Sequence, residues 1–136
     1  IKVCTPSDFR ILVVDDIDDN LFLLQTVLET EGYAVDTAGN GGTALAKVEN
    51  SPPDLILMDV MMPDMNGYEV TRQIRQNPKL PVMPILMVTA YDMINAGQGL
   101  ALGAHSFIRK PIEFDQLLTK VATLLEECHH QNDSAS

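Results

Sequence analysis

The sequence predicts an α/β fold, a doubly wound three-layer sandwich in which helices cover both faces of a parallel five-stranded sheet. Two observations predict it. Five short apolar runs alternate with segments of roughly ten to fifteen residues, a spacing typical of repeated βαβ units. Three of the runs are continuously apolar, as strands covered on both faces must be.

The five apolar runs differ in polarity, and this difference predicts their order in the sheet. The first, third and fourth are apolar throughout, whereas the second and fifth are weaker and more polar. We therefore place the second and fifth at the edges, which gives the doubly wound strand order 2-1-3-4-5. The expected strands are residues 11–14, 33–38, 55–58, 84–88 and 106–108.

The first and last helices carry the clearest periodic signals. Asp18 or Asp19 is placed to cap the first helix, in which three leucines then recur at helical spacing. The last helix is expected to follow Pro111 and to carry apolar residues at helical spacing as far as Cys128. Residues 93–104 predict a poor helix, because Gly97 and Gly99 each cost about 1 kcal/mol relative to alanine in a helix interior.

Length and composition predict one globular domain. The chain has 136 residues, of which 46% are hydrophobic, so it can bury a sizeable core and is unlike a disordered segment. We expect an N-terminal extension at residues 1–9, the domain at residues 10–128, and a polar C-terminal tail at residues 129–136 that frays.

Charge and cysteine usage exclude several classes of function. A formal net charge of -10 argues against binding of nucleic acid by this domain, because phosphates need basic side chains. The sequence has no signal-peptide pattern and no apolar run of membrane length, so no membrane contact is expected. Cys4 and Cys128 lack the spacing of a metal site. We expect a cytoplasmic protein with reduced thiols.

Polar side chains gather where the expected strands end. Asp15 and Asp16 follow the first strand, Asp59 follows the third, Thr89 follows the fourth, and the fifth leads to Lys110. In a doubly wound sheet the carboxyl ends of the strands form the edge where ligands bind. The sequence therefore predicts three acids, a hydroxyl and an amine at one rim. For Asp15 taken alone, a helix-capping role is an open alternative.

The chemistry of this rim indicates a metal and a nucleophile. Three neighbouring carboxylates repel one another by several kcal/mol even at an effective dielectric of about 20. Lys110 can offset one charge, and magnesium suits the rest, because Mg²⁺ takes a few carboxylates and also binds phosphate oxygens. Asp59, the central acid, could then attack phosphorus and form an acyl phosphate.

Four motifs together resemble a known family. The segments "ILVVDD", "LILMDVMMPDMNGYEV", "MVTA" and "FIRKP" resemble, in this order and spacing, the receiver domain of response regulators, the CheY-like family of two-component phosphorelay systems. The resemblance covers about residues 10–125 and implies a flavodoxin-like (βα)5 fold. It implies a signalling domain rather than an enzyme, one that assists its own phosphorylation and slow dephosphorylation.

The resemblance implies a role for each acid. Asp59 would accept a phosphoryl group from a phosphohistidine on a sensor histidine kinase or a histidine phosphotransfer protein. Asp15 and Asp16 would hold Mg²⁺ together with Asp59, and the backbone carbonyl of Met61 would be a further ligand.

The resemblance also implies a switch. Lys110 would pair with the phosphate, and Thr89 would donate a hydrogen bond to it. Phe107 would turn inward when Thr89 moves, although an ordinary core position is the alternative for this side chain. The family also usually has a cis bond before Pro111. We expect the signal to leave through the fourth helix, fifth strand and fifth helix, toward a downstream protein partner or an output domain.

Three alternatives stay open at this stage. The chain could be a stand-alone regulator, or a receiver module of a hybrid histidine kinase or multidomain regulator. A phosphatase with an aspartate nucleophile is more remote, because it needs a second acid two residues after the nucleophile, where this chain has Met61. A flavodoxin-like electron carrier would need a hydroxyl-rich phosphate loop where this chain has the acidic "DDIDDN".

Overall fold

The computed structural model describes residues 8–60, 62, 66–89, 106–109 and 111–135. Its five strands pair in parallel in the order β2-β1-β3-β4-β5, which confirms the predicted strand order and both edge strands. The strands are β1 (Arg10–Val14), β2 (Ala34–Ala38), β3 (Leu55–Asp59), β4 (Ile85–Thr89) and β5 (Ser106–Arg109).

Three strands, β3, β4 and β5, end on a polar side chain, one residue beyond the apolar run that predicted each of them. Asp59 is the last residue of β3 and lies opposite Val88, and Thr89 is the last residue of β4 and lies opposite Arg109. Strand pairing is made by backbone groups, so it continues for as long as the neighbouring strand offers partners. These polar residues are therefore part of the strands, and pairing with the neighbouring strand holds their backbone in place.

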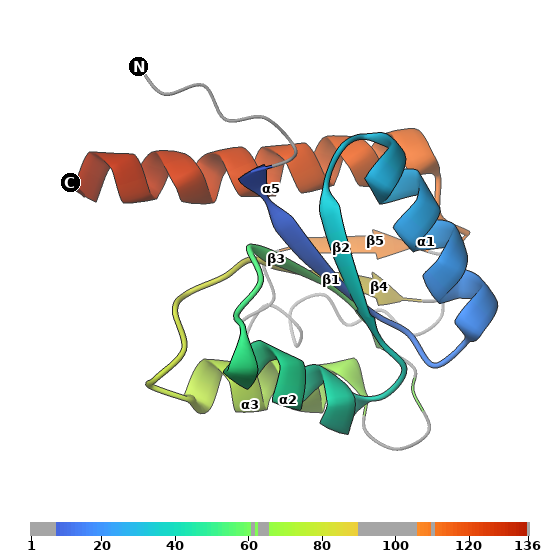
Figure 1. The fold of residues 1–136 in the computed structure, drawn as a ribbon, viewed down its shortest axis with the longest axis horizontal. Coiled ribbons are helices and arrows are strands. Elements are labelled where there is room, and N and C mark those ends of the chain that lie inside the picture. Colours follow the sequence, from blue (N-terminus) through green and yellow to red (C-terminus); the bar gives the residue numbers. More distant parts are fainter. Residues whose placement is uncertain (1–7, 61, 63–65, 90–105, 110, 136) are drawn as a thin grey trace.

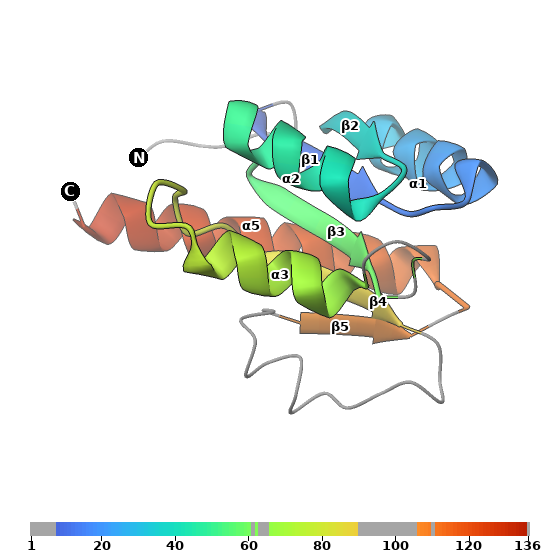
Figure 2. The ribbon, with the colours of Figure 1, turned by 90° about the horizontal axis from the view of Figure 1, so that it is seen from below.

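Helices cover both faces of the sheet, as the doubly wound fold requires. The helices are α1 (Asp18–Thr30), α2 (Gly41–Asn50), α3 (Gly67–Gln76) and α5 (Phe114–Ala135). The two views show α1 and α5 on one face and α2 and α3 on the other (Figures 1 and 2). The poor helix expected at residues 93–104 lies outside the described residues.

The core has two halves, one on each side of the sheet. Successive residues of β1 illustrate the division: Ile11 and Val13 pack with apolar side chains of α1 and α5, whereas Leu12 and Val14 pack with those of α2 and α3. Side chains of a strand alternate between its two faces, so a strand buried on both must be apolar throughout. This explains the continuously apolar central runs.

The helix starts differ from the predicted capping. Asn40 and Asn66 cap α2 and α3, each accepting a hydrogen bond from a backbone N–H three residues later, at 2.8 and 2.9 Å. The prediction that Asp18 or Asp19 caps α1 is wrong. The N-cap is Ile17, which makes no side-chain cap bond. Both aspartates lie inside the first turn, where negative charge is favourable to the helix dipole.

Helix α5 is longer than predicted. Its 22 residues continue through residues 129–135, which were expected to form a fraying tail. After Pro111 the sequence has no further proline and no glycine, so no residue of these two types ends the helix. At 1.5 Å per residue α5 spans roughly 33 Å, and Figure 1 shows it running past the end of the sheet. Among the described residues no helix is long and apolar enough to cross a membrane.

An ion pair links α2 to edge strand β2 and gives a pH-dependent prediction. Lys47 Nζ lies 2.9 Å from Asp36 Oδ1 and also donates to the carbonyl of Thr37 at 2.6 Å. The hydrogen bond from Lys47 is the main reason why the pKa of Asp36 lies below its usual value. A lowered pKa in the folded state stabilises the fold above the ordinary pKa of aspartate, and this contribution is lost as pH falls through the folded value.

We therefore expect Lys47→Met to raise the pKa of Asp36, measured by NMR titration of its side-chain carboxyl carbon. The stability lost at neutral pH should be small, about 0–1 kcal/mol, because the pair is exposed. Lys79→Met, at an exposed lysine in the loop after α3, should leave the pKa of Asp36 unchanged. An unchanged pKa of Asp36 in Lys47→Met would contradict the assignment of the shift to this contact.

Candidate functional site

Three carboxylates meet at the carboxyl edge of the sheet. Asp15 and Asp16 directly follow β1, and Asp59 ends the adjacent strand β3. One oxygen from each carboxylate lies within 4.8 Å of the others. Asp15 and Asp59 are both 3% exposed, whereas Asp16 is exposed to solvent. The structure thus brings together the three acids that the sequence placed at one rim.

The carboxylate of Asp15 is held by its own segment of chain. Its Oδ1 accepts a hydrogen bond from the backbone N–H of Ile17 at 2.9 Å, and its Oδ2 accepts one from Asn20 Nδ2 at 3.3 Å. Its backbone N–H donates to the carbonyl of Ala38 on β2 at 3.1 Å. Sequence reasoning missed Asn20. The signal available was an amide side chain in the first turn of the helix that begins two residues after Asp16.

The position of Asp59 depends on the start of α3. The N–H of Gly67 donates to the carbonyl of Val60 at 2.9 Å, which joins the helix to the residue after Asp59. A Cβ atom at position 67 would lie 2.5 Å from the backbone oxygen of Asp59 and 2.9 Å from Met58 Cγ. Real Cβ atoms do not approach so closely, so this position needs glycine. Sequence reasoning missed this role of Gly67 as well.

The other predicted site residues fall partly within the described residues. Thr89 is fully buried at the end of β4, one position beyond the residue that lies opposite Asp59. Phe107 on β5 is half-buried and packs against the half of the core that lies under α2 and α3. Met61 and Lys110 lie outside the described residues, as does the peptide bond before Pro111.

The donor set fits magnesium. Three carboxylates at this separation repel one another by about 3 kcal/mol or more per pair at an effective dielectric of about 20, so the cluster favours a cation. Carboxylate oxygens are hard ligands of the kind that Mg²⁺ prefers, and the exposure of Asp16 leaves the solvent access that a partly hydrated ion needs.

Comparison with known proteins identifies the family. The family model of the response regulator receiver domain matches residues 11–122. The chain belongs to this family. It is a receiver domain of the response regulators, and its fold is the CheY-like, flavodoxin-like one. Receiver domains are signalling domains that are phosphorylated and bind Mg²⁺ at an acidic pocket. Response regulators in general act with histidine kinases and output partners.

Individual relatives agree with the family match. The chain is 45% identical to the response regulator PleD of Caulobacter vibrioides over 116 residues, which are 85% of this chain and 26% of PleD. It is 34% identical to the protein PilH of Pseudomonas aeruginosa over 117 residues, 85% of this chain and 97% of PilH. A CheY-like receiver domain protein from Methanospirillum hungatei superposes with a TM-score of 0.82 at 37% identity, covering 90% of this chain and 98% of that one.

Proposed function

We propose that Asp59 accepts a phosphoryl group from a phosphohistidine and that the resulting acyl phosphate is the signal of this receiver domain. The observation that carries the proposal is the buried Asp59 carboxylate at the end of a central strand, with those of Asp15 and Asp16 within 4.8 Å. Burying an unpaired carboxylate destabilises a fold. A buried carboxylate beside a cation site therefore indicates a functional role rather than a structural one.

The transfer is a displacement at phosphorus. A carboxylate oxygen of Asp59 forms the new P–O bond while the P–N bond to the donor histidine breaks, and the imidazole leaves with the electron pair of that bond. Asp15, Asp16 and Asp59, with the backbone carbonyl of Met61, would hold Mg²⁺, which supplies positive charge beside the phosphoryl oxygens. The bonds from Ile17 and Asn20 keep Asp15 in a fixed orientation for this task.

Thr89, Lys110 and Phe107 are proposed to read the phosphorylated state. Lys110 pairs with the phosphate, and the Thr89 hydroxyl donates a hydrogen bond to it. Because this hydrogen bond exists only in the phosphorylated form, only that form is stabilised when Thr89 moves toward the phosphate. The half-buried state of Phe107 supports a side chain that can become more buried on this change. We expect the output to leave through β5, α5 and the segment between β4 and β5, where the sequence predicts the fourth helix.

A protein donor would find an apolar surface beside the acidic rim. Ile17, Phe22 and Leu23 at the start of α1 are 49%, 73% and 47% exposed, although large apolar side chains are usually buried. This surface supports a sensor histidine kinase or histidine phosphotransfer protein as the partner. A location in the cytoplasm is a separate part of the proposal. The chain spans about a quarter of PleD but nearly all of PilH, so both a module of a larger regulator and a stand-alone regulator have relatives.

The proposal is tested by phosphorylation without a kinase. Incubation with Mg²⁺ and acetyl phosphate should add the mass of one phosphoryl group, measured on the intact protein. Chelation of Mg²⁺ should prevent the uptake, because the acidic rim then lacks the charge that draws in the donor. Uptake that is unaffected by chelation, or no uptake under either condition, would contradict the proposed chemistry.

Asp16→Asn separates the metal-binding role of the acids from their effect on stability. Asp16 is exposed, so the substitution removes a negative charge without disturbing packing. We expect the affinity for Mg²⁺ to fall by 10-fold or more and the melting temperature without metal to rise, because one source of repulsion is gone.

Asp18→Asn is the matched control for this charge change. Asp18 is also exposed and close in sequence, but it lies outside the carboxylate cluster. It should leave Mg²⁺ affinity nearly unchanged, as measured by calorimetric titration. Equal affinity losses in both variants would show that net charge, rather than coordination by Asp16, governs binding.

A further inference from the structure

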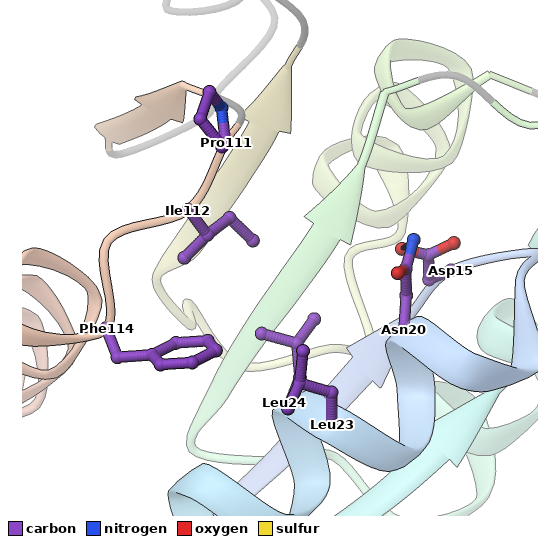
Figure 3. Close-up of a pocket in the computed structure, with 7 residues that line it drawn as sticks. All are labelled: Asp15, Asn20, Leu23, Leu24, Pro111, Ile112 and Phe114. Atoms are coloured by element: carbon purple, nitrogen blue, oxygen red, sulfur yellow. Dashed lines mark hydrogen bonds between the residues drawn. The ribbon is translucent and has the colours of Figure 1, made fainter.

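A pocket lies directly beside the acidic rim, between α1 and the chain that leads into α5. Its volume is about 300 Å³. Leu23 and Leu24 of α1 form one wall, and Ile112 and Phe114 lie across from them. Figure 3 shows the ring of Phe114 directed toward Leu24, and Asp15 at the far end of the same space. The pocket is therefore apolar along its length and polar at one end.

The polar end carries negative charge. It is formed by Asp15 and Asn20, which lie side by side and are joined by a hydrogen bond (Figure 3). Asp15 is one of three carboxylates that lie within 4.8 Å of one another. Exposed acids also flank both walls: Asp18 and Asp19 in the first turn of α1, and Glu113 and Asp115 on either side of Phe114. These acids would repel an anionic ligand and attract a cationic one.

We propose that this pocket binds a small amphipathic cation, an ammonium group attached to an aromatic or branched apolar group. The apolar group lies between Leu23, Leu24, Ile112 and Phe114, and the ammonium lies against Asp15. The volume equals that of about ten water molecules at about 30 Å³ each, which suits a ligand with about as many non-hydrogen atoms.

Such a ligand has a regulatory consequence. Asp15 would contact the ammonium and, in the proposed function, is also a ligand of Mg²⁺, so the two cations compete for one carboxylate. Binding of the amphipathic cation itself is independent of the proposed function, whereas the competition rests on it. By linkage, the factor by which the cation weakens Mg²⁺ binding equals the factor by which Mg²⁺ weakens binding of the cation.

Three probes of similar shape and different charge test the proposal: 2-phenylethylammonium, 2-phenylethanol and 3-phenylpropanoate. Each is titrated into the metal-free protein while the methyl groups of Leu23, Leu24 and Ile112 are followed by NMR. We expect the ammonium to bind in the millimolar range and to shift these methyl signals. The alcohol should bind at least several-fold more weakly, and the carboxylate should not bind. Equal binding of ammonium and alcohol, or shifts centred elsewhere, would overturn the proposal.

Two tryptophan variants locate the binding site. Leu23→Trp fills the pocket from a side chain that is half exposed, so the fold should tolerate it, and it should abolish binding of the ammonium. Phe22→Trp is the matched control, because Phe22 is the adjacent, more exposed residue of α1 and does not line the pocket. Binding that survives Leu23→Trp, or is lost equally in both variants, would contradict the proposed location.

A Mg²⁺ titration separates this proposal from the proposed function. Saturating 2-phenylethylammonium should raise the apparent dissociation constant of Mg²⁺ several-fold in the wild-type protein and leave it unchanged in Leu23→Trp. If the protein binds the ammonium but not Mg²⁺, the proposed function fails and the pocket proposal stands. If both bind without affecting each other, the ammonium does not contact Asp15, and the proposal is wrong.

Discussion

Asp59→Asn should abolish phosphoryl uptake from acetyl phosphate completely. Asparagine has the shape of aspartate, so the buried site should keep its packing, but a neutral amide is a far poorer nucleophile toward phosphorus than a carboxylate. The variant should retain a cooperative unfolding transition and show no added mass after incubation with Mg²⁺ and the phosphodonor.

Asp54→Asn is the control for this substitution. Asp54 immediately precedes β3 at the end opposite Asp59, is exposed, and accepts a hydrogen bond from the backbone N–H of Arg10 at 2.7 Å. The same chemical change at this position should leave phosphoryl uptake at the wild-type level. Efficient uptake by Asp59→Asn, with its fold intact, would refute Asp59 as the acceptor.

Gly67→Ala should destabilise the domain and slow its phosphorylation. The new Cβ would lie 2.5 Å from the backbone oxygen of Asp59, so either α3 or the end of β3 must shift. Overpacking of this kind typically costs about 1–3 kcal/mol, which should outweigh the gain of up to about 1 kcal/mol from the higher helix propensity of alanine. Urea unfolding measures the first effect, and the rate of phosphoryl uptake measures the second.

Gly42→Ala shows what the same substitution does without the close contact. Gly42 also lies in the first turn of a helix, and its Cβ would meet only Asn40 Oδ1 at 3.5 Å, an ordinary contact, among the described atoms. We expect this variant to be as stable as the wild type or up to about 1 kcal/mol more stable. A Gly67→Ala variant that behaves like Gly42→Ala would show that the start of α3 adjusts freely and does not position Asp59.

Local patterns along the chain predicted most of the fold. The central strands were recognisable because strands buried on both faces must be apolar throughout, and the edge strands because they are not. The meeting of Asp15, Asp16 and Asp59 also followed from the sequence, since strand order alone brings the carboxyl ends of β1 and β3 together. Periodicity and topology were sufficient for these features.

Features that depend on packing between distant segments were not predicted. Gly67 matters because a Cβ atom at this position would clash with the backbone oxygen of Asp59, a proximity that no local pattern contains. The predicted cap of α1 is wrong because the helix begins at Asp18, earlier than predicted, directly after the turn in which the carboxylate of Asp15 accepts from the N–H of Ile17. The prediction for the end of α5 is wrong because polar residues alone do not end a helix.

The central claim is that the phosphoryl group resides on Asp59, and chemical trapping tests it most directly. Borohydride reduces an acyl phosphate of aspartate to homoserine, which marks the modified residue permanently. The phosphorylated protein is reduced, digested and sequenced by mass spectrometry. We predict homoserine at position 59, dependent on Mg²⁺ during the phosphorylation step. Homoserine at position 15 or 16, or no homoserine in a protein that carries the added mass, would contradict this assignment.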